Sequence, residues 1–410
     1  MGQCKLPGSL PRADSESATI SAISNFPMLI FATIAGVVVV LTVLLDAFET
    51  VVLPRRVRRQ FRITVWFYRY TWIPWRKITS LIKSPGRREN FLGYFGPLSL
   101  LFLLALWAGG LILGFALLQY GAGEHVQLSN EPITFGRVLY LSGSTFFTLG
   151  YGDITPTSAL ARALAVLEAG MGFGFLGTVI GYLPTIYSSF SRREIEISLL
   201  DARAGSPPTA AELLIRFGKC PQLDEIFRDW ERWAAELLES HISYPPLSFF
   251  RSQHNNQSWL GALTMILDAS ALVAAGVDGI RDEQAKLTFA VARHAMVDLA
   301  QLVNAHYDPL APNRLGEEHL LKLRQALLDH DMRFRDAMES EQKLTHLRSL
   351  YEPYAIAMAR NLFISLPPWV HPEKKKDNWE AGPWDRAIQA RSLAGLGRKA
   401  ERVRRMDDHF

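Results

Sequence analysis

The segment Thr148-Leu149-Gly150-Tyr151-Gly152-Asp153 lies between two long apolar stretches of this 410-residue chain. Glycine adopts positive backbone φ angles without steric cost, so Gly150 and Gly152 allow successive carbonyl groups to point in one direction. A row of such oxygens can replace the water shell of a dehydrated potassium ion. The hydroxyl of Thr148 adds one more oxygen at the lower end of the row. The segment therefore predicts a potassium selectivity filter.

The filter segment and its surroundings resemble the pore domain of the tetrameric potassium channel family, in its form with two helices and a pore loop. A helix-like stretch, Phe135 to Phe147, precedes the segment, and the likeness covers residues 91–190. The resemblance implies that Tyr151 packs outward to hold the width of the filter and that Asp153 closes its outer mouth. Where the family often has a tryptophan partner for that aspartate, spacing gives Tyr140, whose hydroxyl is a candidate to hold Asp153. The potassium sites that the resemblance implies are Thr148, Leu149, Gly150, Tyr151 and Gly152.

Three apolar stretches are long enough to cross about 30 Å of hydrocarbon at 1.5 Å per residue. They are Met28 to Phe48, Pro97 to Tyr120 and Ala159 to Tyr187, and no comparable run is expected after Ser191. The first lacks a basic leader and a small-residue cleavage site, so it is expected to be a retained helix. The predicted fold is an all-α membrane protein with three transmembrane helices, a re-entrant pore helix and filter loop, and an α-helical cytoplasmic domain.

The charges between the first two spans predict the orientation of the chain. Eleven lysines and arginines lie there, beginning at Arg55 and ending at Arg88, whereas the loop from Gly121 to Thr134 has none. By the positive-inside rule the basic loop is cytoplasmic, the N-terminus is outside and the C-terminal region is cytoplasmic, in a multi-pass protein of the plasma membrane. Aromatic residues alternate with these arginines, which is typical of a helix in the headgroup layer. Anionic membrane lipids are therefore the expected partner of residues 55–88, with a partner-binding basic helix as the alternative.

The chain contains one filter segment, whereas a ring of carbonyls around an ion needs four. The sequence therefore predicts a homotetramer. Each pore helix would then direct its negative C-terminal end at a central cavity. Family resemblance places Phe173, Leu176, Ile180 and Pro184 on the cavity side of the inner helix. The arginines cluster in polar sequence outside the first span, so no voltage sensor is predicted.

Three residues of the inner helix are gating candidates. Gly172 falls where the family has its gating hinge, although close packing between helices is an equally good interpretation. Pro184 cannot donate the helical bond to Ile180, so it is expected to kink or weaken the inner end of this helix. Glu168 is costly within a membrane unless it is paired or protonated. It is either a gate element sensitive to pH or ions, or a carboxyl hydrogen-bonded to Ser142, Ser144 or Thr145 of the pore helix.

Helix-period patterns run through the C-terminal half, with breaks at the Pro- and Gly-rich segments. We expect an all-helical regulatory domain with a core of its own, whose ligand the sequence does not name. No nucleophile–base set, phosphate loop or histidine metal pattern is present, so neither an enzyme nor an organic cofactor is predicted, and the charge gives no reason to invoke nucleic acid. The predicted segments are 1–26 (extracytoplasmic tail), 27–50 (first transmembrane helix), 51–90 (basic amphipathic segment), 91–190 (pore domain), 191–390 (helical cytoplasmic domain) and 391–410 (basic tail).

The predicted function is passive, potassium-selective permeation through a tetrameric pore, gated by bending of the inner helix and modulated by the cytoplasmic domain. One alternative is a weakly selective cation channel, which Tyr151 at the outer ring argues against. A second alternative, of a different class, is a membrane-anchored receptor or signalling module with little conduction.

Overall fold

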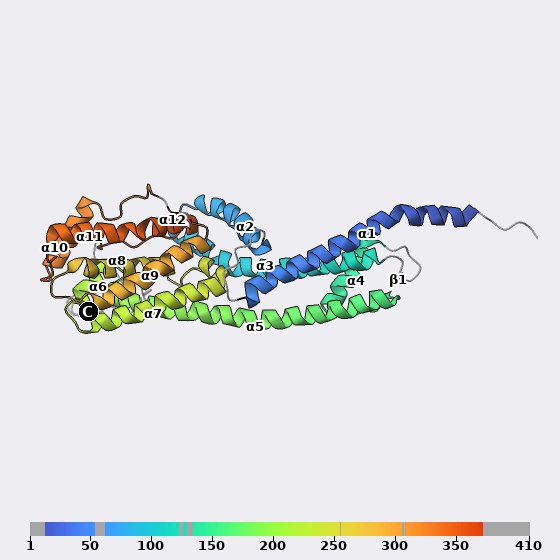
Figure 1. The fold of residues 1–410 in the computed structure, drawn as a ribbon, viewed down its shortest axis with the longest axis horizontal. Helices are drawn as coiled ribbons and strands as arrows, with labels where there is room; N and C mark the ends of the chain where they lie inside the picture. The colour runs from blue at the N-terminus through green and yellow to red at the C-terminus, as the bar shows by residue number, and fades with distance from the viewer. Residues whose placement is uncertain are drawn as a thin grey trace, which may run out of the picture.

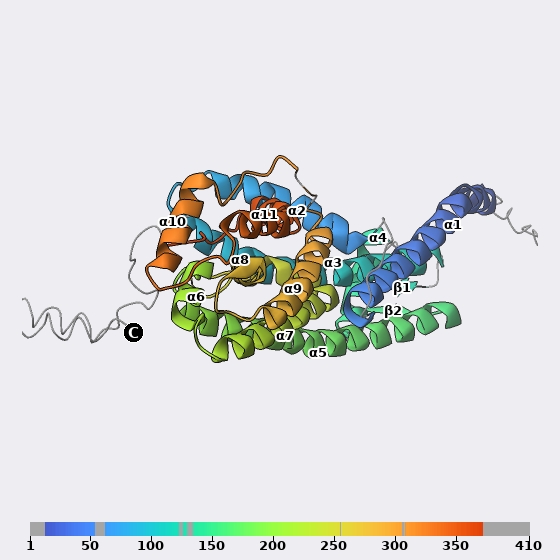
Figure 2. The same ribbon diagram turned by 60° about the vertical axis from the view of Figure 1, so that its left-hand side comes forward.

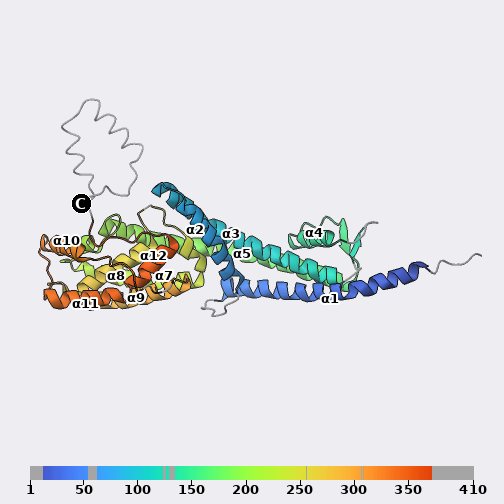
Figure 3. The same ribbon diagram turned by 90° about the horizontal axis from the view of Figure 1, so that it is seen from above.

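The molecule is elongated, with a rod of long helices at one end and a bundle of shorter helices at the other (Figure 1). The computed structural model describes residues 13–53, 62–122, 126–128, 134–254, 256–305, 307 and 309–371. The predicted basic tail 391–410 and residues 1–12 of the predicted N-terminal tail lie outside these residues, and the remainder of that tail belongs to a helix that begins at Ala13. One helix, α5 (Ala159–Ala204), belongs to both ends of the molecule and joins them without a break (Figures 1 and 3).

The rod consists of the helices around the filter segment. Their bounds are α1 (Ala13–Ala47), a π-helical turn η1 (Phe48–Val52), α2 (Ile63–Ser80), α3 (Pro85–Gly121), α4 (Phe135–Phe146) and α5. Two short strands, β1 (Val126–Leu128) and β2 (Ile154–Pro156), pair antiparallel beside the filter segment and were not predicted. The described residues are otherwise almost entirely helical, as the sequence predicted.

The bundle at the other end contains seven α-helices and one 3-10 turn among the described residues. They are α6 (Ala210–Phe217), α7 (Gln222–Ser243), η2 (Pro245–Phe249), α8 (Trp259–Gly276), α9 (Glu283–Leu302), α10 (Glu317–Leu328), α11 (Ala337–Ser349) and α12 (Glu352–Leu362). The helical pattern of this half is interrupted between Leu328 and Ala337. Asp336 starts a new helix because its carboxylate accepts the N–H groups of Met338 and Glu339, which is a helix N-cap.

Four described helices, rather than three, are long and apolar enough to cross a membrane. The three expected ones are present in α1, α3 and α5. The fourth is α8, so the expectation that no comparable run follows Ser191 was wrong. Every residue in its apolar window is buried within the protein, and α6, α9 and α11 pack around it (Figure 2). A helix that is apolar on all sides can be the centre of a soluble core as well as a membrane span, and here protein covers it.

The polar contacts of α8 show why it remains in the bundle. Asp268 is fully buried on α8, and its carboxylate pairs with Arg314 at 2.8 Å. The hydroxyl of Tyr351 donates a further hydrogen bond to Asp268. Burial disfavours the charged form of Arg314, but the Asp268 carboxylate outweighs this effect and raises the pKa of Arg314. A paired charge at the centre of α8 therefore fixes that helix to its protein neighbours.

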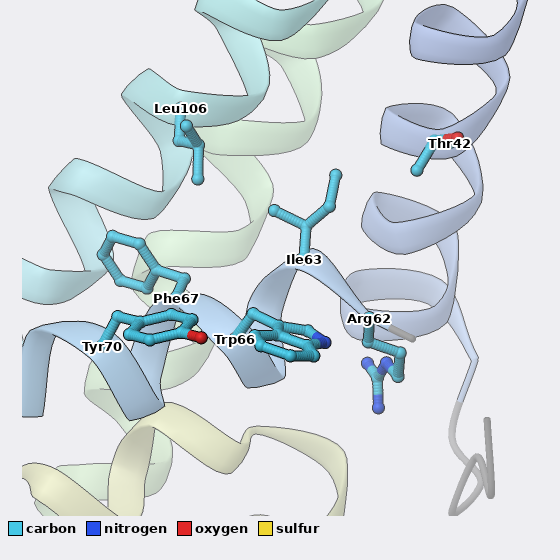
Figure 4. Close-up of a pocket in the computed structure, with 7 residues that line it drawn as sticks. All are labelled: Thr42, Arg62, Ile63, Trp66, Phe67, Tyr70 and Leu106. Atoms are coloured by element: carbon cyan, nitrogen blue, oxygen red, sulfur yellow. The ribbon is translucent and has the colours of Figure 1, made fainter. Parts of the chain in front are cut away.

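Helix α2 lies across the ends of α1 and α3 and contacts the bundle with one face (Figure 3). Tyr68 stacks on Phe249 of η2 with ring centroids 5.0 Å apart, and the Trp72 indole donates to the carbonyl of Asn361 at 3.0 Å. The opposite face leaves Trp66 and Tyr70 exposed. The buried face of α2 thus binds the chain's own C-terminal half, and its other face is only partly covered by the described residues (Figure 4).

Candidate functional site

The filter segment begins where pore helix α4 ends. The Phe147 N–H donates to Gly143 O at 3.1 Å, and the Leu149 N–H donates to Ser144 O at 2.8 Å. These bonds hold the first filter residues against the last turn of α4. The carbonyl end of a helix carries a partial negative charge, so this arrangement favours a cation near the inner end of the segment.

The backbone of the filter segment alternates between positive and ordinary φ angles. The φ angles are +56° at Thr148, +57° at Gly150 and +77° at Gly152. The two glycine conformations are those that the sequence predicted, whereas the positive φ of Thr148 was not expected. A threonine in this region is sterically strained, which is typical of residues whose position serves a function. The alternation places every second residue in the conformation that a one-sided row of carbonyls requires.

Contacts from three directions hold the outer end of the filter segment. Strand β2 follows the segment directly, and its Ile154 pairs with Leu128 of β1. The Tyr140 hydroxyl on α4 hydrogen-bonds the Asp153 side chain, as the sequence analysis anticipated. The Arg162 guanidinium donates to Pro156 O at 3.2 Å. The mouth of the segment is therefore tied to the pore helix, the outer strand and α5.

Glu168 joins three helices behind the filter. Its carboxylate is fully buried on α5, accepts a hydrogen bond from Ser142 of α4, and accepts a second from Gln119 of α3 at 2.9 Å. Ser142 is one of the three partners proposed from the sequence, and its hydroxyl also lies 2.7 Å from Ile112 O. Gln119 was missed, although a glutamine within the apolar stretch Pro97 to Tyr120 was a visible signal. Neutral donors thus satisfy Glu168, and its role in gating stays a prediction.

Gly172 is the point of closest approach between α5 and the pore helix. A Cβ atom added at Gly172 would collide with the carbonyl oxygen of Phe146, the last residue of α4, whereas one added at Gly170 or Gly174 would meet nothing. Only glycine fits this contact, so the packing interpretation of Gly172 holds. The hinge interpretation remains a prediction.

One face of the chain near the filter carries many uncovered apolar side chains. Tyr151 is 70% exposed, and the cavity residues predicted from the family, Phe173 and Ile180, are 74% and 65% exposed. Leu149 and Leu176 are also exposed, as is Pro184. A monomeric surface rarely leaves so large an apolar patch open to water. The predicted cavity residues are three or four positions apart, so they share one uncovered side of α5.

The inner end of α5 is attached to the bundle. The helix continues through Pro184 without interruption, and Tyr182 and Ile186 are buried against Leu247 and Phe250 of the η2 region. The aromatic ring of Tyr182 lies 5.8 Å from that of Tyr244. The segment in which the sequence places the gate is thus in direct contact with the C-terminal domain.

A buried polar joint follows immediately. Arg193 donates to the carbonyls of Leu247 at 3.1 Å and Phe250 at 2.9 Å, and pairs with Glu194 at 3.0 Å. Its guanidinium also lies 3.4 Å from Nε2 of His241. Burial, together with the charge of Arg193, lowers the pKa of His241 to about 3, so this imidazole is neutral. The joint is held by one cation, which binds two backbone carbonyls and one carboxylate.

Comparison with known proteins gives three similarities. Residues 101–188 match the family model described as "Ion channel". The chain is 24% identical over 249 residues to the uncharacterized membrane protein YdjJ of Bacillus subtilis (strain 168), a match that covers 60% of this chain and 72% of that protein. It is 35% identical over 83 residues to protein LctB of Geobacillus stearothermophilus, which covers 18% of this chain and 61% of that protein. No solved structure matches the chain.

Proposed function

Residues 101–188 belong to the ion channel family, and on that premise we propose that this multi-pass membrane protein is a potassium-selective channel that works as a homotetramer. The single observation that carries the proposal is the alternating backbone of residues 148–152 at the carbonyl end of α4. Four copies of this segment around one axis would present rings of oxygens that replace the hydration shell of a potassium ion. The proposed activity is passive permeation of the ion, with no catalytic step.

The uncovered face of α5 supports the tetrameric arrangement. Phe173, Leu176 and Ile180 are exposed at intervals of three and four residues, so they share one side of the helix. In a tetramer this side would line a cavity below the filter, and Leu149 and Tyr151 would pack against neighbouring chains. An apolar constriction between Ile180 and Tyr187 would close the path by dewetting. We place the filter mouth and the N-terminus outside the cell and the bundle in the cytoplasm, in accordance with the basic charges of residues 55–88.

The test is potassium flux against sodium flux in vesicles that contain the purified full-length protein. Gly150→Asp adds a side chain at φ +57° and a charge among the proposed ion sites, so potassium flux is expected to disappear. Gly136→Asp is the matched control, because Gly136 is exposed near the start of α4, its added Cβ meets no atom, and an acid near a helix N-terminus is favourable. Flux that survives Gly150→Asp would contradict the filter assignment.

Two other outcomes correspond to the alternative functions. Equal potassium and sodium flux, lost in Gly150→Asp, would indicate a weakly selective cation channel. A folded tetramer without flux, also after truncation at Arg193, would favour a membrane-anchored receptor. Retained or increased flux on truncation would mean that the bundle restrains the pore, as the contacts of Tyr182 and Ile186 suggest.

A further inference from the structure

Helix α5 extends past its predicted membrane-spanning part, and there its two sides differ. One side packs on the bundle, where Arg193, Ile197 and Leu200 are buried. On the other side, α5 forms an edge of the molecule with no described element outside it (Figures 1 and 2). Five exposed residues, spaced alternately three and four positions apart, line this open side and are called the α5 seam: Ser188, Ser191, Ile195, Ser198 and Ala202. This spacing places them together on one side of the helix.

The α5 seam is exposed but carries no charge. Arg193 and Glu194 are buried, and Arg192 and Glu196 lie beside the seam. A helix side that faces water normally carries charged residues. In a symmetric parallel contact each residue meets its own copies, so a charge there would face an identical charge at short range. The uncharged seam therefore favours contact with the same seam of another copy.

The α5 seam continues the line of residues that we place around the pore cavity. Ile180 and Pro184 are exposed on α5, and Ser188 follows Pro184 after the same interval of four residues. The helix has no break between them. Four copies of α5 around a cavity would therefore bring their seams near the same axis. Chains that are already joined present each other with a high effective concentration of this surface, so even a weak contact forms.

We infer that the α5 seam binds the same seam of other copies, so that the inner helices continue as a parallel helix assembly beyond the membrane, as far as Ala202. Alternating intervals of three and four residues allow parallel helices to interlock their side chains. The serine hydroxyls make lipid hydrocarbon an unsuitable cover, and Ile195 supplies the largest apolar contact. The inference rests on the proposed tetramer and adds a contact surface that the filter and cavity residues do not provide.

Disulfide cross-linking of the full-length protein in vesicles tests this contact. Cys4 and Cys220 are replaced by serine, and one cysteine at a time is then introduced. Ile195→Cys is expected to give cross-linked dimers of chains on mild oxidation, because a disulfide forms only where the two Cα atoms come within about 7 Å. Leu287→Cys on α9 is the matched control and is expected to remain uncross-linked, because Leu287 is 56% exposed and Ile195 is 55% exposed.

Cysteines at the two ends of the seam determine the direction of the helices. Ser188→Cys and Ala202→Cys are each expected to form dimers, because only a parallel contact in register brings each end next to its own copy. Dimers from Ile195→Cys alone would indicate an antiparallel contact and would overturn the inference. Equal yields from Ile195→Cys and Leu287→Cys would also overturn it, since they would reflect random collision.

A charge variant tests whether the seam holds the copies together. Ile195→Asp places like charges next to one another in the assembly, so the oligomer is expected to dissociate at a lower detergent concentration, whereas Leu287→Asp is expected to leave this concentration unchanged. Equal dissociation of the two variants would contradict the seam. Cross-linking is measured without ion flux, so the two hypotheses fail separately. A protein that cross-links at the seam but does not conduct retains this inference, and one that conducts potassium without seam cross-links refutes it.

Discussion

The most apolar 18-residue windows of helices α5 and α8 have almost the same mean hydropathy, 1.7 and 1.6, yet the protein covers them to very different extents. Only 11% of the apolar window of α5 is buried within the chain, whereas 100% of that of α8 is buried. Length and composition indicate how readily a helix is transferred out of water. They do not show whether lipid or protein then surrounds the helix. For α5, lipid and the neighbouring chains of the proposed tetramer would supply the remaining cover, whereas for α8 the cover comes from its own bundle.

The buried acidic residues of the two helices also differ in their partners. Glu168 on α5 is held by the neutral groups of Ser142 and Gln119. Asp268 on α8 is paired with the cation of Arg314. A charge pair is tolerable in a protein core with further hydrogen bonds, while neutral donors are the partners that the helices next to α5 supply.

The largest effect that would test this comparison is the solubility of the two halves. A fragment of residues 188–371 keeps the Arg193 joint and all of α8, so it is expected to remain in solution without detergent. The complementary fragment, residues 1–187, is expected to require detergent. Ultracentrifugation and a thermal melt followed by circular dichroism measure both properties. If the 188–371 fragment partitions into vesicles, α8 is a membrane span and the comparison fails.

The charge pair of α8 gives the next largest effect. Arg314→Met leaves the Asp268 carboxylate buried without its cation, so the 188–371 fragment is expected to lose about 3–5 kcal/mol of unfolding free energy. Urea denaturation measures the loss. Lys322→Met is the matched control, because its pair with Glu318 at 2.6 Å is exposed and is expected to contribute well under 1 kcal/mol, about 0.5 kcal/mol or less. Arg314→Met combined with Asp268→Leu should recover most of the stability, and a loss that persists in the double variant would point to packing rather than charge.

A smaller effect is expected where α5 touches the pore helix. Gly172→Ala forces Phe146 and the end of α4 to move, at a cost of about 1–3 kcal/mol. Gly174→Ala, two residues away with open space around it, is expected to leave the stability unchanged. The thermal midpoint of the purified protein and potassium flux in vesicles measure the two consequences. Equal thermal midpoints for the two variants would show that the close approach of Gly172 to Phe146 does not exclude a side chain at position 172.

The filter was predictable from the sequence because its properties depend on short-range backbone chemistry. Gly150 and Gly152 permit positive φ wherever they occur, and the observed angles agree with that expectation. The hydrogen bond from Ser142 to Glu168 was also among the predicted partners, because both residues lie on apolar helices that must meet. The positive φ of Thr148 was not predictable, since it is imposed on a threonine by its neighbours.

Features that depend on distant parts of the chain were missed. Gln119 reaches Glu168 across 49 positions of sequence, and no local pattern connects them. The cover of α8 depends on where α6, α9 and α11 pack, so its periodic pattern did not show that it would be buried on every side. Likewise, the helix of the basic segment was expected to lie in the headgroup layer, but Phe249 and Asn361 of the C-terminal half contact its Tyr68 and Trp72.

The unbroken course of α5 has a thermodynamic consequence. Helix α5 runs from the filter to the Arg193 joint without a flexible linker. A displacement of α5 at Pro184 must therefore also be accommodated by the contacts of Arg193 with His241 and Leu247. Any molecule that binds the bundle more tightly in one pore state shifts the open–closed equilibrium by the ratio of its two affinities, and opening the pore changes its affinity by the same factor. In the proposed channel, the closed and open states would then bind such a molecule with different affinities, so their equilibrium could be followed by a binding assay.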